Sequence, residues 1–92
     1  MKTIHKYHLP RTAETVNVLM PQGARVLCVQ AQYDHPCMWV FVDDRQPLEN
    51  RQFLTRLTGG NCVLIENPRS YIGTAILEGG DHVVHVFDGA TA

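Results

Sequence analysis

Short segments in which apolar and polar residues alternate run along most of the chain, with turn-forming residues between them. A period of two is typical of β-strands, because successive side chains of a strand point to opposite faces of a sheet. The segment 24–33 has the clearest alternation, with Leu27, Val29, Ala31 and Tyr33 expected on one apolar face. The strands predicted from this pattern cover residues 2–9, 15–20, 24–33, 37–42, 71–77 and 82–88.

Turn-forming residues predict how these segments connect. Asp34-His35-Pro36 separates two predicted strands and is short enough for a hairpin. Glu78-Gly79-Gly80-Asp81 predicts a second hairpin, because glycine readily adopts the positive φ angles that tight turns require. Both connections favour antiparallel pairing.

The segment 49–58 fits two kinds of element. As a strand it places Phe53, Thr55 and Leu57 on one face, and as a helix it has Leu54 and Leu57 on one stripe between Pro47 and Gly59. We favour the strand. The expected fold is therefore all-β, a small antiparallel sandwich or barrel-like sheet of six to seven short strands, with a short helix near 47–58 as the alternative.

Composition and charge narrow the class of protein. The chain has 92 residues, of which 45% are hydrophobic and 18% charged, as expected for one folded domain over 1–88, with 89–92 as a disordered tail. No apolar run approaches the ~20 residues of a membrane span. The net charge of −1 comes without a basic stripe, so we expect no direct nucleic-acid binding. The chain has three cysteines, Cys28, Cys37 and Cys62, an odd number without close spacing. This indicates a reducing, cytoplasmic environment rather than a disulfide scaffold.

Several predicted strands are apolar on both faces. In 37–42, Met38, Val40 and Val42 oppose Trp39 and Phe41, and in 82–88, Val84 and Val86 oppose Val83 and Phe87. The strands of a sheet with one solvent-exposed face would alternate apolar and polar residues instead. The second face needs a cover, which loops, a short helix, another copy of the chain or a partner would supply. We favour self-association and expect a homo-oligomer.

No residue pattern indicates catalysis or a metal. His5 and His8 are three residues apart, as are His82 and His85, and on a strand this spacing puts the two rings on opposite faces. Neither Ser70 nor any cysteine lies in a nucleophile motif. We therefore expect no enzyme activity, no catalytic residues, no cofactor and no metal site.

A set of arginines and aromatic residues supplies the candidate binding residues. Arginines that bind phosphates and aromatic rings that stack on bases would form a nucleotide pocket where subunits meet. The same residue types anchor protein interfaces, and a third interpretation is that Trp39 is core and the arginines are solvated. The candidates are Trp39, Arg45, Arg51, Arg56, Arg69 and Tyr71.

Several short motifs resemble a family of small uncharacterised proteins of phages and prophages. They are Lys6-Tyr7-x-Leu9, Met20-Pro21-x-Gly23-Ala24-x-Val26-Leu27-x-Val29-Gln30, Pro36-Cys37-x-Trp39-Val40-x-Val42-Asp43, Thr58-Gly59, Tyr71-Ile72-Gly73-Thr74 and His85-Val86-Phe87. The resemblance covers most of the chain and implies a viral accessory protein of the bacterial cytoplasm. It brings no catalytic residues.

This resemblance leads to three functional expectations. The first is a non-enzymatic phage protein that inhibits a host antiviral defence, for example a CRISPR effector, by protein–protein binding. The second is an oligomeric sponge that sequesters a nucleotide immune signal. The third is a structural or virion-associated protein. The expected partner is thus a host defence protein or a nucleotide-type small ligand.

Overall fold

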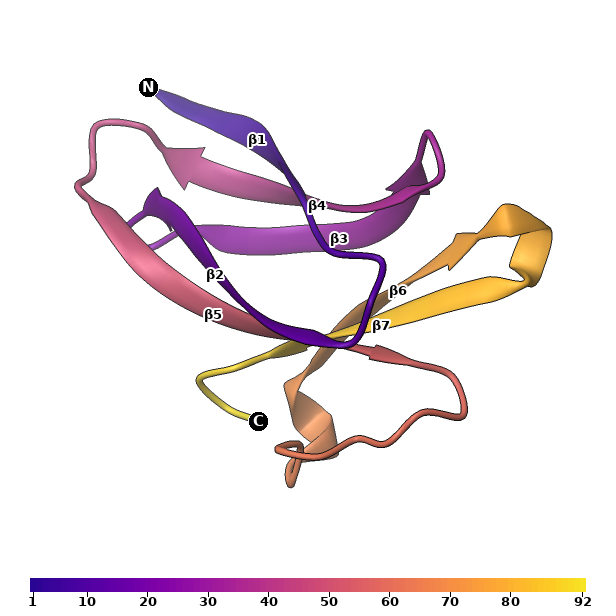
Figure 1. Cartoon of the computed structure of the whole chain (residues 1–92). Helices are drawn as coiled ribbons and strands as arrows, with labels where there is room; N and C mark the ends of the chain where they lie inside the picture. Colours follow the sequence, from indigo (N-terminus) through magenta and orange to yellow (C-terminus); the bar gives the residue numbers. More distant parts are fainter.

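Seven strands form two antiparallel sheets in the computed structural model, which describes residues 1–92. One sheet has the order β1-β4-β3 and the other β2-β5-β7-β6, and Figure 1 shows them as an upper and a lower layer. The all-β prediction is confirmed, and the arrangement is a sandwich rather than a closed barrel. The strands are β1 (Lys2–His8), β2 (Glu14–Pro21), β3 (Arg25–Gln32), β4 (His35–Asp43), β5 (Leu48–Leu57), β6 (Tyr71–Leu77) and β7 (His82–Asp88).

The segment with two interpretations is a strand, and the helix alternative is wrong. β5 lies inside the four-stranded sheet, where it pairs with β2 on one side and β7 on the other. These ladders use its backbone N–H and C=O groups, and the four residues 53–56 are buried on both faces. Tertiary pairing therefore overrides the local helical pattern. The only helical segments are two three-residue 3-10 turns, η1 (Pro68–Ser70) and η2 (Glu78–Gly80), and no helix is long enough to span a membrane.

The inner faces of the two sheets pack into one apolar core. Burying each large side chain of this kind is worth about 1.5–3 kcal/mol. At one edge the sheets approach so closely that a Cβ on Gly73 of β6 would lie 2.9 Å from Cβ of Val29 in β3. The core consists of Leu9, Met20, Ala24, Val29, Met38, Val40, Val42, Phe53, Ala75, Leu77, Val84 and Val86.

Of the four residues predicted to form the apolar face of the segment 24–33, only Val29 is buried. The β3–β4 ladder shifts by one residue between Val26 and Cys28, which is a β-bulge. Because of the extra residue, Val26 and Val29 both pack on the core while Leu27 is 50% exposed. Tyr33 is not in the strand at all and is 87% exposed in the turn that follows.

Both predicted hairpins are present, and their turns meet at one corner of the molecule. Tyr33 and Asp34 have φ of 50° and 62°, as in the two-residue turns that match strand twist. The Asp34 carboxylate accepts a 2.7 Å hydrogen bond from the backbone N–H of Glu78, which also has a positive φ. Arg11, between β1 and β2, donates to both acidic side chains. Three connections are thus held to one another.

The four residues after β7, which the sequence predicts as a disordered tail, make defined hydrogen bonds. The carbonyl oxygen of Ala92 accepts from the N–H groups of Glu66 and Asn67 at 3.0 and 2.9 Å. The N–H of Gly89 donates to the carbonyl of Gln52 at 2.7 Å. The tail therefore lies against the loop 58–70 and against β5 just beyond the end of the β5–β7 ladder.

Candidate binding surface

The outer face of the four-stranded sheet is covered by the chain itself around β5, whereas Leu19, Leu48, Tyr71 and Ile76 on the same face stay exposed. Leu54 and Arg56 point outward from β5, away from the core, as do their register partners Phe87 and His85 in β7. Even so, Leu54 and Arg56 are only 3% and 5% exposed. The loop 58–70 and the tail 89–92 pass along this side of the sheet (Figure 1). We call the surface around Leu54 and Arg56 the covered face.

Arg56 fastens the loop to the covered face. Its Nη1 donates to the carbonyl oxygens of Glu14 and Thr55 at 3.2 and 2.8 Å, and its Nη2 donates to that of Val63 at 2.7 Å. Its Nε is the one buried side-chain polar atom that lacks a partner, and no carboxylate pairs with the guanidinium. A buried charge without hydrogen-bond partners is very costly. The burial of the Arg56 guanidinium therefore depends on these three carbonyls.

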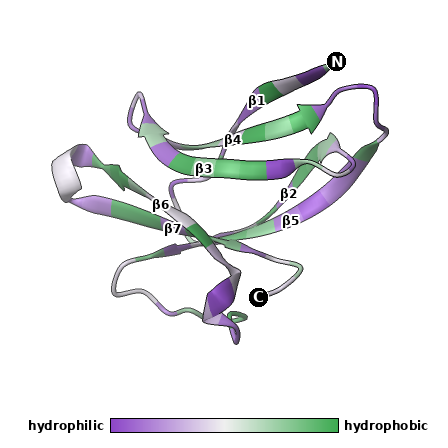
Figure 2. Ribbon diagram, turned by 180° about the vertical axis from the view of Figure 1, so that it is seen from behind, coloured by the Kyte–Doolittle hydropathy of each residue, from purple (hydrophilic) through white to green (hydrophobic).

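The outer face of the three-stranded sheet has no such cover. Ile4 of β1 stands opposite Phe41 of β4, and Cys28 of β3 stands opposite Trp39. Ile4, Leu27 and Phe41 are 55%, 50% and 43% exposed, and Trp39 and Cys28 are half-buried. Figure 2 shows the hydrophobic colouring along β3 and β4, and no loop crosses above this sheet (Figure 1). We call these five residues the open face.

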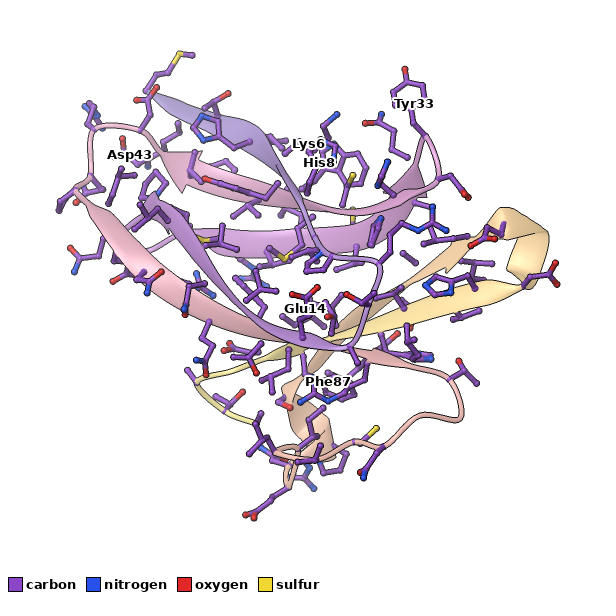
Figure 3. All side chains as sticks on the ribbon, in the orientation of Figure 1. Lys6, His8, Glu14, Tyr33, Asp43 and Phe87 are labelled. Atoms are coloured by element: carbon purple, nitrogen blue, oxygen red, sulfur yellow. The ribbon has the colours of Figure 1, made fainter.

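Polar groups surround the open face. Lys6 lies opposite Trp39, and its Nζ donates to Oε1 of Gln32 at 2.6 Å. Figure 3 shows Lys6 and His8 on this side of the sheet, with Tyr33 projecting from the hairpin at its end. The Sγ of Cys37 lies 3.7 Å from Nδ1 of His8, and the open face is therefore bounded there by a thiol–imidazole contact.

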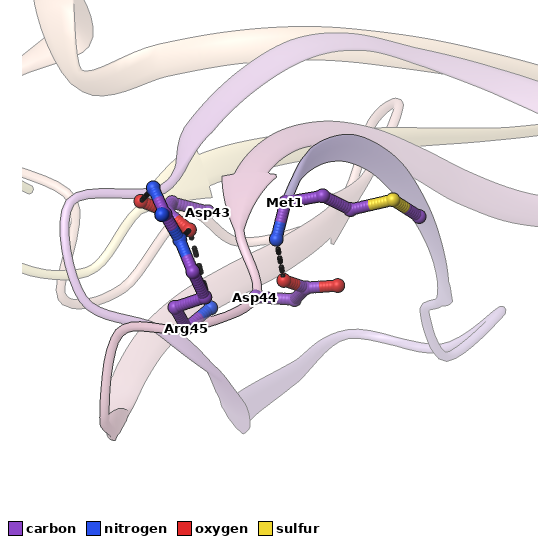
Figure 4. Close-up of polar contacts among 4 residues, drawn as sticks. All are labelled: Met1, Asp43, Asp44 and Arg45. Atoms are coloured by element: carbon purple, nitrogen blue, oxygen red, sulfur yellow. Dashed lines mark hydrogen bonds and ion pairs between the residues drawn. The ribbon is translucent and has the colours of Figure 1, made fainter.

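At the opposite end of β4, one carboxylate is neutralised locally. Arg45 donates from Nε and Nη2 to the two carboxylate oxygens of Asp43, both at 3.0 Å (Figure 4). These bonds hold the pKa of Asp43 well below its usual range and raise the pKa of Arg45. The neighbouring Asp44 pairs with the N-terminal ammonium of Met1 (Figure 4).

The histidines form separate contacts. On the outer side of β7, His85 accepts or donates through both ring nitrogens, at 2.7 Å to Oγ1 of Thr58 and 3.0 Å to Oγ1 of Thr74. His82 bonds the carbonyl of Arg11. No group of three or more His, Cys, Asp or Glu side chains is arranged to hold a metal ion, and the surface has no pocket.

The six candidate residues from the sequence lie in different parts of the molecule. Trp39 is on the open face, whereas Arg56 and Tyr71 are on the outer side of the other sheet. Arg51 packs its guanidinium 5.6 Å from the ring of Phe53 and donates to the carbonyl of Ala24 at 2.7 Å. Arg45 lies in the loop after β4 and Arg69 in η1. The structure does not bring the six together.

Sequence reasoning missed Ile4 and Leu27 of the open face and Lys6 beside it. Ile4 and Lys6 alternate with inward residues in β1, so the period-two pattern was able to place them together, although it did not show that the face stays uncovered. Leu27 was expected inside, and only the bulge turns it outward. Long-range pairing, rather than any local motif, builds this surface.

No curated protein and no solved structure matches the chain. The family described as Domain of unknown function (DUF7352) matches residues 1–92. The chain belongs to the DUF7352 family.

Proposed function

We propose that this protein is a non-enzymatic binding protein that docks on another protein through the open face. The observation that carries the proposal is the contrast between the two outer faces. The chain places a loop and a tail over the inner strand β5 of one sheet, and it leaves Phe41 of the inner strand β4, with Ile4 and Leu27 beside it, in water on the other. Burying side chains of this size is worth up to about 1.5–3 kcal/mol each, which a partner gains on docking.

Within this proposal, the protein is a phage accessory protein that inhibits a host antiviral defence protein, such as a CRISPR effector, in the host cytoplasm. The support is the motif resemblance described above together with an outward surface made of hydrocarbon and aromatic groups. Such groups anchor protein interfaces, where aromatic residues and arginine are enriched.

The nucleotide-sponge alternative has weaker support. Arginines that bind phosphates need free N–H groups. Arg51 donates to a main-chain carbonyl, and Arg56 is buried with its two terminal nitrogens bonded to three carbonyls. Arg45 is bonded to Asp43, so Arg69 is the one candidate arginine whose guanidinium has no hydrogen-bond partner in the chain.

A matched pair of substitutions tests the docking face. Phe41 and Ile76 are both exposed apolar residues, 43% and 63%, but they lie on different sheets. In co-purification of the tagged protein from host lysate, we expect one stoichiometric partner on wild type and on Ile76→Glu. Phe41→Glu should lose it, while the circular dichroism spectrum stays that of wild type. Equal retention by both variants, or no partner on wild type, would refute the proposal.

A further inference from the structure

The charges around the open face carry an inference that rests on the proposed function and specifies the partner's chemistry. β1, β3 and β4 together contain one acidic residue, Asp43, and its carboxylate is already bonded to Arg45. The exposed side chains of Lys2, Lys6 and Arg25 form no ion pair, although Lys2 stands opposite Asp43 in the β1–β4 ladder. The face therefore presents unbalanced positive charge although the whole chain has a net charge of −1.

These cations lie beside the apolar residues and on both edges of the sheet. In the ladder Lys6 of β1 is opposite Trp39, and Arg25 of β3 is opposite Phe41. Lys2 lies on the same side of β1, two residues from Ile4. The pattern is an apolar centre with a cationic margin, and a complementary surface has an apolar centre with carboxylates around it.

We infer that the open face binds a protein surface with an apolar centre and an acidic margin, and not a second copy of this chain. In a two-fold dimer the same patch lies on both sides of the interface. A dimer through the open face would therefore bring Lys2, Lys6 and Arg25 of one copy toward those of the other without intervening carboxylates. Asp34 and Asp44, at the two ends of β4, are already paired with Arg11 and the Met1 ammonium. The other acidic residues lie on the other sheet or its loops, namely Glu14, Glu49, Glu66, Glu78, Asp81 and Asp88.

A nucleic acid also carries negative charge, but the residues fit it less well. Single strands bind where exposed aromatic rings stack with successive bases along a cationic groove. Here the exposed rings of Phe41 and Tyr33 lie at opposite ends of β3, and the ring of Trp39 between them is half-buried. The other exposed hydrocarbon comes from Ile4 and Leu27, which do not stack. Aliphatic side chains of this kind fit an apolar protein surface.

Photo-crosslinking identifies the occupant directly. A benzoylphenylalanine placed at Leu27 reports on the open face, and the same residue at Ile76 is the matched control on the other sheet. After irradiation in host lysate, we expect a Leu27 adduct with another protein, at a peptide that lies beside a cluster of Asp and Glu, and no such adduct from Ile76. An adduct with a second copy of the chain, or one that nuclease removes, would overturn the inference.

Charge reversal separates this inference from the proposed function. We expect retention of the partner to fall in the order wild type, Lys6→Gln/Arg25→Gln, Lys6→Glu/Arg25→Glu, by about tenfold or more for the last. Arg69→Glu, outside the open face, should behave as wild type. Higher salt should weaken the wild-type complex, because ions screen exposed charges. Partner binding that is lost with Phe41→Glu but does not change with charge reversal or salt would support the proposed function and contradict the acidic margin.

Two measurements on the purified protein complete the test. Light scattering of the eluting protein should give a mass that Phe41→Glu does not change. An increase in anisotropy of a labelled dT20 oligonucleotide, lost on Lys6→Glu/Arg25→Glu, would instead assign the face to nucleic acid. A dimer that Phe41→Glu dissociates would assign it to a second copy.

Discussion

The covered face and the open face carry similar side chains in different surroundings. Each has an outward leucine with an outward arginine near it, namely Leu54 and Arg56 on the covered face, and Leu27 of the open face with Arg25 at its margin. Leu54 is 3% exposed and Leu27 50%, while Arg56 is 5% exposed and Arg25 lies in solvent. An apolar outer row in a strand therefore does not by itself indicate a binding surface. The informative feature is whether the chain supplies a cover.

The two leucines provide the largest expected contrast. Leu54→Ala should lower the free energy of unfolding by about 2–5 kcal/mol, because it leaves a cavity at a buried position. Leu27→Ala should lower it by less than about 1 kcal/mol, since half of that side chain is already in water. Urea denaturation of both variants measures the difference. Equal losses would mean that the two outer faces are packed alike.

The two arginines sharpen the same comparison. Arg56→Ala removes the donors for three main-chain carbonyls and should cost about 1.5–3 kcal/mol, with faster amide hydrogen exchange in 58–70. Arg25→Ala should stay within about 0.5 kcal/mol. Arg56→Met should recover part of the loss, because an apolar side chain there needs no ligands. Unchanged exchange in Arg56→Ala would show that the loop is held by other contacts.

The smallest effect concerns Asp43 at the end of β4. Because Arg45 lowers the pKa of Asp43, the ionised carboxylate stabilises the fold. That contribution is complete above the ordinary aspartate pKa of about 3.9 and is lost as pH falls below it. Asp43→Asn should therefore melt slightly below wild type at pH 7, and the gap in Tm should close in acid. A gap that is constant from pH 7 to strong acid would rule out this ion pair as its cause.

The strands and both hairpins were predictable from the sequence because alternation and turn residues are local signals. β5 was predictable as a strand only in part, because its neighbours β2 and β7 decide between two local patterns. The bulge at Val26–Cys28 was not predictable from alternation, since it is defined by the ladder with β4. It changes the side on which Leu27 lies, and thereby the composition of the open face.

The candidate site was less accessible to sequence reasoning than the fold. Trp39 was singled out and does lie on the open face, but Arg56 has the same residue type as Arg25 and a different environment. Which sheet the loop 58–70 covers depends on where Val63 meets Arg56, a contact between strand and loop that residue type does not encode. The sequence indicated which kinds of side chain the protein offers, whereas their positions on the two sheets required the three-dimensional structure.

The order of the strands also has a consequence for how the molecule assembles. β3–β4 and β6–β7 are hairpins between neighbours, but β1 pairs with β4 and β2 pairs with β5. During synthesis β1 and β2 cannot pair until β4 and β5 have emerged from the ribosome. Folds with many such distant pairings fold slowly, on a scale of roughly milliseconds to seconds. We expect the hairpins to form first and the N-terminal strands to join last.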